Sequence, residues 1–311
     1  TAELMRSHIR SQQPGGLTDQ QAASAPDQSL RSRNWFDITW TTAAIIANYE
    51  FNEHARMNVK VFGIFGNRNS VGYLPAGGIS IGDTINHSTH QYNARNVNAD
   101  KYRNAGMEAR FISDYQVFHT KQTVSAGIRL YKGTTYRYAA DGKGTTGTGY
   151  DMRLTDDTWA RDIDFKTTNL AAFAENIFRV SKKFLVIPGI RYEYITGNAG
   201  GRNGFTATGA PVILQEQKKS RGFFLAGIGA EYHTGIHTEI YANITQAFRP
   251  VQFADLTAPP TTDVIDQELQ DARGYNADLG YRGKIKSWLF FDAGIFFLQY
   301  NNRIGTIVQQ R

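Results

Sequence analysis

The residues best suited to chemistry in this sequence are arginines that stand near the ends of expected strands. A guanidinium group presents a planar fork of N–H donors, which pairs with a carboxylate through two parallel hydrogen bonds. Several such arginines on one side of a sheet would form a vestibule for an anionic ligand. The candidate binding residues are Arg68, Tyr136, Arg137, Arg153, Arg202, Arg249 and Gln252. Ordinary solvated loop arginines are the alternative.

Histidines occur in two close pairs, His87 with His90 and His233 with His237. Either pair could bind a metal ion with help from other ligands, since imidazole suits zinc, copper, iron and nickel. The chain has no cysteine, and neither pair has a third histidine nearby. We therefore expect solvated histidines, no metal site and no cofactor, with haem capture as a minor alternative.

Two further patterns look like enzyme motifs but lack the required context. Residues 142–147 match a dinucleotide-binding glycine loop, which needs a strand before it and a helix after it. A polar stretch without helical spacing follows instead. Glycosidases hold two carboxyls at a fixed separation in a rigid cleft, whereas the acids here lie in a polar loop beside arginines; they are Asp156, Asp157, Asp162 and Asp164. We expect no enzyme activity.

The amino-acid composition limits which class of protein could carry these candidate residues. The 311 residues include 13% aromatic residues and 30 glycines, and only 41% are hydrophobic. Such a chain suits strands with one apolar and one wet face. The net charge is +6, but the basic residues are scattered among acids, which favours an anionic ligand over nucleic acid. No uninterrupted apolar run reaches the roughly 18 to 20 residues of a transmembrane helix.

Alternation with a period of two runs through most of the chain and predicts strands. In residues 221–232, Phe224, Ile228 and Tyr232 share one face, while Gly227 and Glu231 lie on the other. The same alternation recurs in residues 105–111, 124–130, 184–194 and 274–282. The expected fold class is therefore all-β.

The expected connections alternate between short polar turns and long links rich in glycine, asparagine and threonine. Short turns are expected near residues 52–55, 119–121, 181–183, 234–236 and 283–286. Long links are expected at about residues 12–32, 67–100, 141–162, 197–218 and 250–271. This pattern predicts about eleven strands, each of roughly ten residues or more.

A transmembrane antiparallel β-barrel has this asymmetry, with short turns at the periplasmic end and long loops outside. The bilayer requires every backbone group to be paired, so the sheet must close. A soluble sandwich would have strands of about five or six residues and turns of similar length. Ile228 is expected to face lipid and Gly227 the lumen. Aromatic residues expected in interfacial girdles are Trp35, Trp40, Tyr49, Tyr194, Tyr232 and Trp288.

Four stretches carry a recognisable family pattern. They are residues 13–18 followed by 33–36, residues 65–73, residues 174–178 followed by 188–193, and residues 247–256 followed by 267–269 and 274–282. The most specific element is a strand, a loop containing Pro250, and a strand with Asp278 where glutamate is commoner. Together these stretches resemble TonB-dependent outer-membrane receptors, most closely those for ferric citrate and other iron chelates (siderophores).

The resemblance implies a 22-stranded barrel that is plugged by an N-terminal domain and driven by TonB through a box near the N-terminus. With about eleven strands, residues 1–311 would be a partial barrel domain without the plug and the C-terminal strands. The implied function is a receptor in the Gram-negative outer membrane that binds ferric citrate or another siderophore and imports it. The implied partners are the iron chelate, the TonB complex, outer-membrane lipid and lipopolysaccharide.

Three alternatives stay open at this point. A passive porin would lack the plug, a haem or other metal-chelate receptor would differ in its loops, and an adhesion barrel would bind proteins. Tyr136 and Tyr138 could stack on a catecholate chelate, and loop arginines could bind lipopolysaccharide phosphates. Loop chemistry selects the ligand, and the fold alone does not name it.

Overall fold

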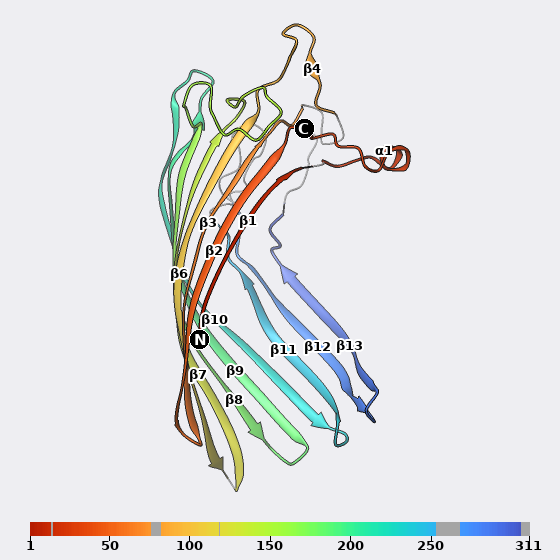
Figure 1. The fold of residues 1–311 in the computed structure, drawn as a ribbon. Coiled ribbons are helices and arrows are strands. Elements are labelled where there is room, and N and C mark those ends of the chain that lie inside the picture. The colour runs from red at the N-terminus through yellow and green to blue at the C-terminus, as the bar shows by residue number, and fades with distance from the viewer. Residues whose placement is uncertain (14, 76–81, 118, 253–267, 306–311) are drawn as a thin grey trace.

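A single antiparallel sheet of eleven strands dominates the structure and curves into an open trough (Figure 1). The computed structural model describes residues 1–13, 15–75, 82–117, 119–252 and 268–305. Each strand of the sheet pairs with the next one along the chain, so the sheet is a meander. Within these residues, no helix is long and apolar enough to cross a membrane. The all-β, antiparallel prediction is confirmed.

The strands are β1 (Ala2–Gln12), β2 (Trp35–Asn52), β3 (Ala55–Gly72), β6 (Asn96–Val117), β7 (Thr120–Ala140), β8 (Arg161–Arg179), β9 (Phe184–Phe205), β10 (Pro211–His233), β11 (Thr238–Arg249), β12 (Ala272–Ile285) and β13 (Leu289–Asn301). A separate two-stranded ribbon consists of β4 (Ile85–Asn86) and β5 (Gln91–Tyr92). The short helix α1 (Asp19–Ser24) begins at a capping box formed by Thr18 and Gln21.

The strand connections differ at the two ends of the sheet. Short turns join β2 to β3, β6 to β7, β8 to β9, β10 to β11 and β12 to β13, as the sequence predicts. Long links follow β1, β3, β7 and β11. Residues 253–256 of the fourth family stretch fall in the last of these links and lie outside the described residues.

The predicted long link at residues 197–218 is wrong. Strands β9 and β10 continue as a paired hairpin, and only residues 206–210 connect them. The composition misleads because the end of β9 is polar and rich in glycine. Gly201 adopts a φ of +131°, and a Cβ there would lie 2.1 Å from the Asp162 carbonyl oxygen. Such a backbone, together with the register shifts near Leu214, erases the period-two pattern.

An apolar belt lies on one face of the sheet, here called the outer face. One cross-strand row of this belt is Ile45, Val61, Met107, Leu130, Leu170 and Tyr194. Four residues further toward the long links, the same face carries Thr41, Phe65, Arg103, Thr134 and Lys166. A tilted transmembrane strand needs about 9–11 residues, whereas β10 has 23. The outer halves of the long strands therefore extend beyond the apolar belt.

The predicted faces of β10 agree with the structure. Ile228 is 50% exposed on the outer face with Phe224 and Tyr232, whereas Gly227 and Glu231 lie on the opposite face. The girdle prediction is wrong for two tryptophans. Trp40 lies on the inner face with its ring 5.1 Å from that of Tyr102. Trp35 is partly buried where Tyr150 and Leu154 of the link after β7 pack on the same cluster, and its Nε1 donates to the Thr148 carbonyl oxygen at 2.8 Å.

Two buried arginines join three of the long links at the same end of the sheet. Arg33 is 1% exposed, pairs with Asp83 at 2.6 Å and donates to the carbonyl oxygens of Asn93 and Thr146. Arg95 is fully buried and donates to the carbonyl oxygens of Arg33 and Gly149. Burial and the nearby Arg33 charge lower the pKa of Arg95. The links therefore form one connected body above the sheet.

Candidate ligand-binding site

A cavity of about 510 Å³ lies on the inner face of the sheet, between strands β6 to β10 and residues 250–252. Its lining residues are Tyr102, Asn104, Tyr131, Gly133, Thr135, Arg137, Phe165, Thr167, Ile195, Gly197, Lys219, Arg221, Pro250, Val251 and Gln252. Basic, aromatic, hydroxyl and amide side chains predominate in this set.

Strand register brings these side chains together. One cross-strand row runs from Tyr131 on β7 through Asn169 on β8 and Ile195 on β9 to Arg221 on β10. The adjacent row runs from Asn104 through Gly133, Thr167 and Gly197 to Lys219. A third row holds Tyr102, Thr135 and Phe165. Residues two apart on a strand share a face, so three successive rows form one continuous wall.

Asp100 organises the basic residues at the outer end of this wall. Arg137 Nε donates to Asp100 Oδ1 at 3.0 Å, and Arg68 Nη1 lies 3.9 Å from Asp100 Oδ2. The Asp100 side chain is only 8% exposed. One carboxylate therefore holds two guanidinium groups in place and neutralises only one of them.

Asp271 has a similar role on the opposite side of the cavity. Arg221 Nε donates to Asp271 Oδ2, and the Val251 backbone N–H donates to Asp271 Oδ1, both at 2.8 Å. This contact fixes residues 250–252 over the wall. Lys219 forms no ion pair with the described residues. Among the described residues, four cations thus stand against two carboxylates, which gives this part of the site a net positive charge.

Aromatic rings supply flat apolar surfaces between these charges. The Arg137 guanidinium lies 5.4 Å from the centre of the Phe165 ring. Tyr102 packs on Trp40 and donates from its hydroxyl to Asp100 at 3.2 Å. Tyr131 lies between Gly133 and Arg129 on the same inner face. Such a wall can hold a multiply charged anion through charge-assisted hydrogen bonds while ring faces pack against its flat parts.

Three of the seven candidate residues converge here. Arg137 and Gln252 line the cavity, and Arg68 joins it through Asp100. Arg249 ends β11 just before the Pro250–Gln252 stretch, but it does not line the cavity.

The other three candidates lie elsewhere. Tyr136 points to the opposite face from Arg137, beneath the Arg103 guanidinium at 5.7 Å. Arg202 donates to the carbonyl oxygen of Trp159 at 2.7 Å and so anchors the link after β7. Arg153 is 83% exposed and pairs with Asp151, whose pKa it lowers to about 2 through its hydrogen bonds.

Sequence reasoning missed Lys219, Arg221 and the aromatic residues of the wall. The signal was present in β7, where Tyr131, Gly133, Thr135 and Arg137 alternate two apart. Extending that alternation from Arg137 back along the strand would have placed Tyr131, Gly133 and Thr135 on the same face as Arg137. The wrong link at residues 197–218 hid Lys219, because without the β9–β10 pairing nothing placed it on the inner face.

The remaining sequence motifs make structural contacts. Residues 142–147 supply carbonyl oxygens to the buried arginines, and the next described element is strand β8. Lys143 pairs with Asp156 within the same link. His87 and His90 lie in the tight turn of the β4–β5 ribbon. His233 pairs with Glu239 at 3.1 Å instead of with His237.

Comparison with known proteins assigns the chain to a family. The family model described as "TonB dependent receptor-like, beta-barrel" matches residues 6–311. The chain belongs to this family. Its barrels lie in the Gram-negative outer membrane, and the chain is an outer-membrane protein accordingly. The comparison with curated proteins finds no match.

Solved structures of TonB-dependent receptors share the fold. The ferric citrate transporter FecA in its unliganded form matches with a TM-score of 0.73 and 18% identity, covering 97% of this chain and 40% of that one. The ferric-catecholate import receptor Fiu from E. coli K12 in its closed form has a TM-score of 0.68 and 13% identity, covering 97% and 49%. The pyoverdine receptor FpvA from Pseudomonas aeruginosa PAO1 has a TM-score of 0.62 and 14% identity, covering 87% and 37%. The chain thus spans less than half the length of these receptors.

Proposed function

We propose that this chain forms part of a TonB-dependent receptor that captures an anionic ferric chelate, of the citrate or catecholate type, and imports it. The single observation that carries the proposal is the cavity, where Arg137, Lys219 and Arg221 in the lining, with Arg68 beside them on Asp100, outnumber their described carboxylate partners. The family and the printed functions of its structural neighbours support the same class of cargo.

The wall fits an anion better than it fits haem. Carboxylate and catecholate oxygens accept from guanidinium and ammonium donors, and Asn104, Thr135 and Gln252 offer further polar groups. Haem iron is usually held by histidine, cysteine, methionine or tyrosine. Among the described residues that line the cavity there is no histidine, cysteine or methionine, and of its two tyrosines Tyr102 already donates its hydroxyl to Asp100.

Uptake by the full-length receptor tests the proposal. A strain without the gene, complemented with the wild-type gene, is supplied with one radiolabelled ferric chelate at a time, with and without functional TonB. We expect uptake of an anionic chelate that requires both the gene and TonB. Uptake that persists without TonB would indicate a passive pore, and normal uptake of every chelate in the deletion strain would reject the proposal.

A substitution in the wall links that uptake to the cavity. Lys219→Gln removes a cation that no described carboxylate neutralises, so the concentration for half-maximal uptake should rise about 10-fold. Arg153→Gln is the matched control, because Arg153 is exposed and pairs outside the cavity. Equal effects from the two variants would place the ligand elsewhere.

A further inference from the structure

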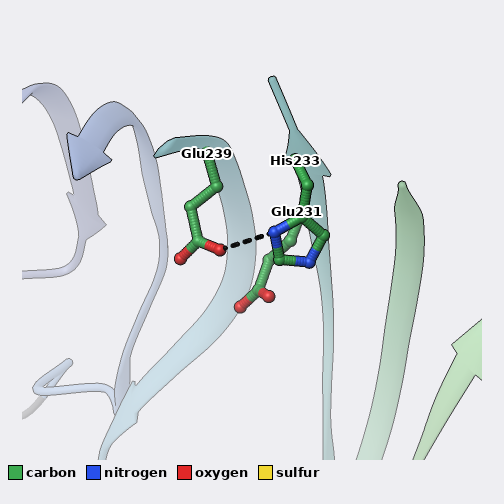
Figure 2. Close-up of side chains that lie close together, drawn as sticks. All are labelled: Glu231, His233 and Glu239. Carbon is green, nitrogen blue, oxygen red and sulfur yellow. Dashed lines mark ion pairs between the residues drawn. The ribbon is translucent and has the colours of Figure 1, made fainter. Parts of the chain in front are cut away.

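A second cluster of polar side chains lies at the short-turn end of β10 and β11. Glu231 and His233 on β10 and Glu239 on β11 point toward one another (Figure 2). His233 is twelve residues along β10 from Arg221, which is roughly 40 Å at about 3.3 Å per residue. The cluster is therefore independent of the ligand cavity.

Strand geometry fixes the three side chains on one face. Glu231 and His233 are two residues apart and share the inner face, while Tyr232 between them is 46% exposed on the outer face. Glu239 is the register partner of His233 across the β10–β11 ladder. His233 Nδ1 lies 3.1 Å from Glu239 Oε2. All three side chains are partly buried.

The distances fit a metal ion after small rotations. One ligand atom from each residue lies within 4.8 Å of the others. Zinc bonds to nitrogen and carboxylate oxygen are about 2.0–2.2 Å long in a tetrahedral site, which separates neighbouring ligand atoms by about 3.4 Å. His233 Nδ1 and Glu239 Oε2 are already 3.1 Å apart, and the widest separation in the cluster exceeds the tetrahedral value by about 1.4 Å at most.

The local charge also favours a cation. Arg282 donates to Glu239 at 2.6 Å, and its Nη2 lies 3.7 Å from Glu231. One guanidinium cannot neutralise two carboxylates, so the cluster remains negative. A hollow of about 680 Å³ opens beside it, and the further ionisable groups that line it are His237, Lys284 and Asp292. Lys284 Nζ lies over the Phe290 ring at 5.0 Å, and Asp292 accepts from the Tyr241 hydroxyl.

We propose that Glu231, His233 and Glu239 bind a divalent transition-metal ion, with zinc the ion that best matches one imidazole and two carboxylates. Water from the hollow completes the coordination shell. Arg282 holds the carboxylates when the metal is absent and moves aside when it binds. The proposal goes beyond chelate import, because this ion binds at the opposite end of the sheet.

The expected effect is a cross-link between the two strands. Residues 227–233 of β10 pair with β11 over only seven positions, fewer than any other neighbouring strands in the described sheet. The ladder from β10 to β9 has 19 pairs by comparison. A metal bridging His233 and Glu239 would tie this short ladder together at its end.

The test uses the purified full-length receptor without a histidine tag, titrated with Co²⁺ and followed by visible absorption. We expect one Co²⁺ per receptor with d–d bands, displaced by Zn²⁺. His233→Gln should weaken binding by at least about 10-fold, whereas His237→Gln, its matched control in the adjacent turn, should bind as the wild type does. Arg282→Gln should bind Co²⁺ more tightly, because it removes the competing cation.

Thermal unfolding provides a second readout that is independent of chelate uptake. Zn²⁺ should raise the unfolding midpoint of the wild type and of His237→Gln, and leave that of His233→Gln unchanged. The proposal is overturned if the wild type binds no Co²⁺, if His233→Gln binds it as well as the wild type, or if Arg282→Gln binds it more weakly. If the proposed chelate import were wrong, the Co²⁺ titration and the unfolding midpoints would not be affected.

Discussion

Individual side chains on the two faces of β10 and β11 meet different solvents. Ile228 is half-exposed on the outer apolar face, and Thr245 is exposed on the inner face of the neighbouring strand at the same level. Ile228→Arg should lower the free energy of unfolding by about 2–4 kcal/mol, because it places a charge in lipid. Thr245→Arg should cost much less. Urea unfolding of the full-length receptor in lipid vesicles measures both, and equal costs would contradict the assignment of faces.

Asp151 makes one of the outer links sensitive to acid. Its hydrogen bonds from Arg153 lower its pKa from 3.8 to about 2. A carboxyl with a depressed pKa stabilises the fold above its ordinary pKa, and that contribution is lost as the pH falls through about 2. Cleavage of residues 141–160 by pepsin should therefore rise as the pH falls from about 4 to about 2. Asp151→Asn should be cleaved readily throughout; a wild type with no pH dependence would reject the role of this pair.

Sequence-based prediction of single residues succeeded where a side chain with suitable donors also stands near the end of a strand. Arg137 and Gln252 were found because each stands near a strand end and carries a suitable donor. Arg202 and Tyr136 have the same features but face away from the cavity, which only strand register reveals. Lys219 and Arg221 were missed because their role depends on pairing with β9 and on Asp271, which lies 50 residues after Arg221.

At the level of elements, the buried arginines couple links that are far apart in the chain. Arg33→Met would leave Asp83 buried without its partner, which costs about 3–5 kcal/mol for a broken buried pair. We expect faster hydrogen exchange in residues 141–150 as well as around Arg33, measured by mass spectrometry. Adding Asp83→Asn should restore part of the protection, because the unpaired charge is then removed. Changes confined to residues 30–35 would show that the links are not coupled.

Strand order and turn positions could be predicted, because alternation and short polar turns are local signals. The β9–β10 extension could not, since its strands lie beyond the apolar belt and no solvent contrast imposes a two-residue period. The buried arginine contacts were also hidden. Arg33 and Arg95 bond mainly to backbone carbonyl oxygens, which carry no sequence signature.

Across the whole molecule, the sheet has two edges. Strands β1 and β13 each pair on one side only within the described residues. A backbone group left unpaired in lipid costs several kcal/mol, so both edges need neighbouring strands in the membrane. The sheet curves into a trough (Figure 1). The cavity lies between the inner face of β6 to β10 and residues 250–252, so a closed barrel would enclose it.

Enclosure determines how the charge of the cavity acts on a ligand. Salt shortens the Debye length from about 10 Å at 0.1 M to about 3 Å at 1 M, so steering of an anion toward the four cations weakens with salt. The affinity of the purified full-length receptor for its anionic ferric chelate should fall as NaCl rises, measured by quenching of intrinsic fluorescence. In Lys219→Gln the affinity should fall less steeply with NaCl concentration. In Arg153→Gln it should fall as steeply as in the wild type, because Arg153 pairs with Asp151 outside the cavity. An affinity that does not change with salt would mean that shape and stacking on Tyr102, Tyr131 and Phe165 select the ligand instead of charge.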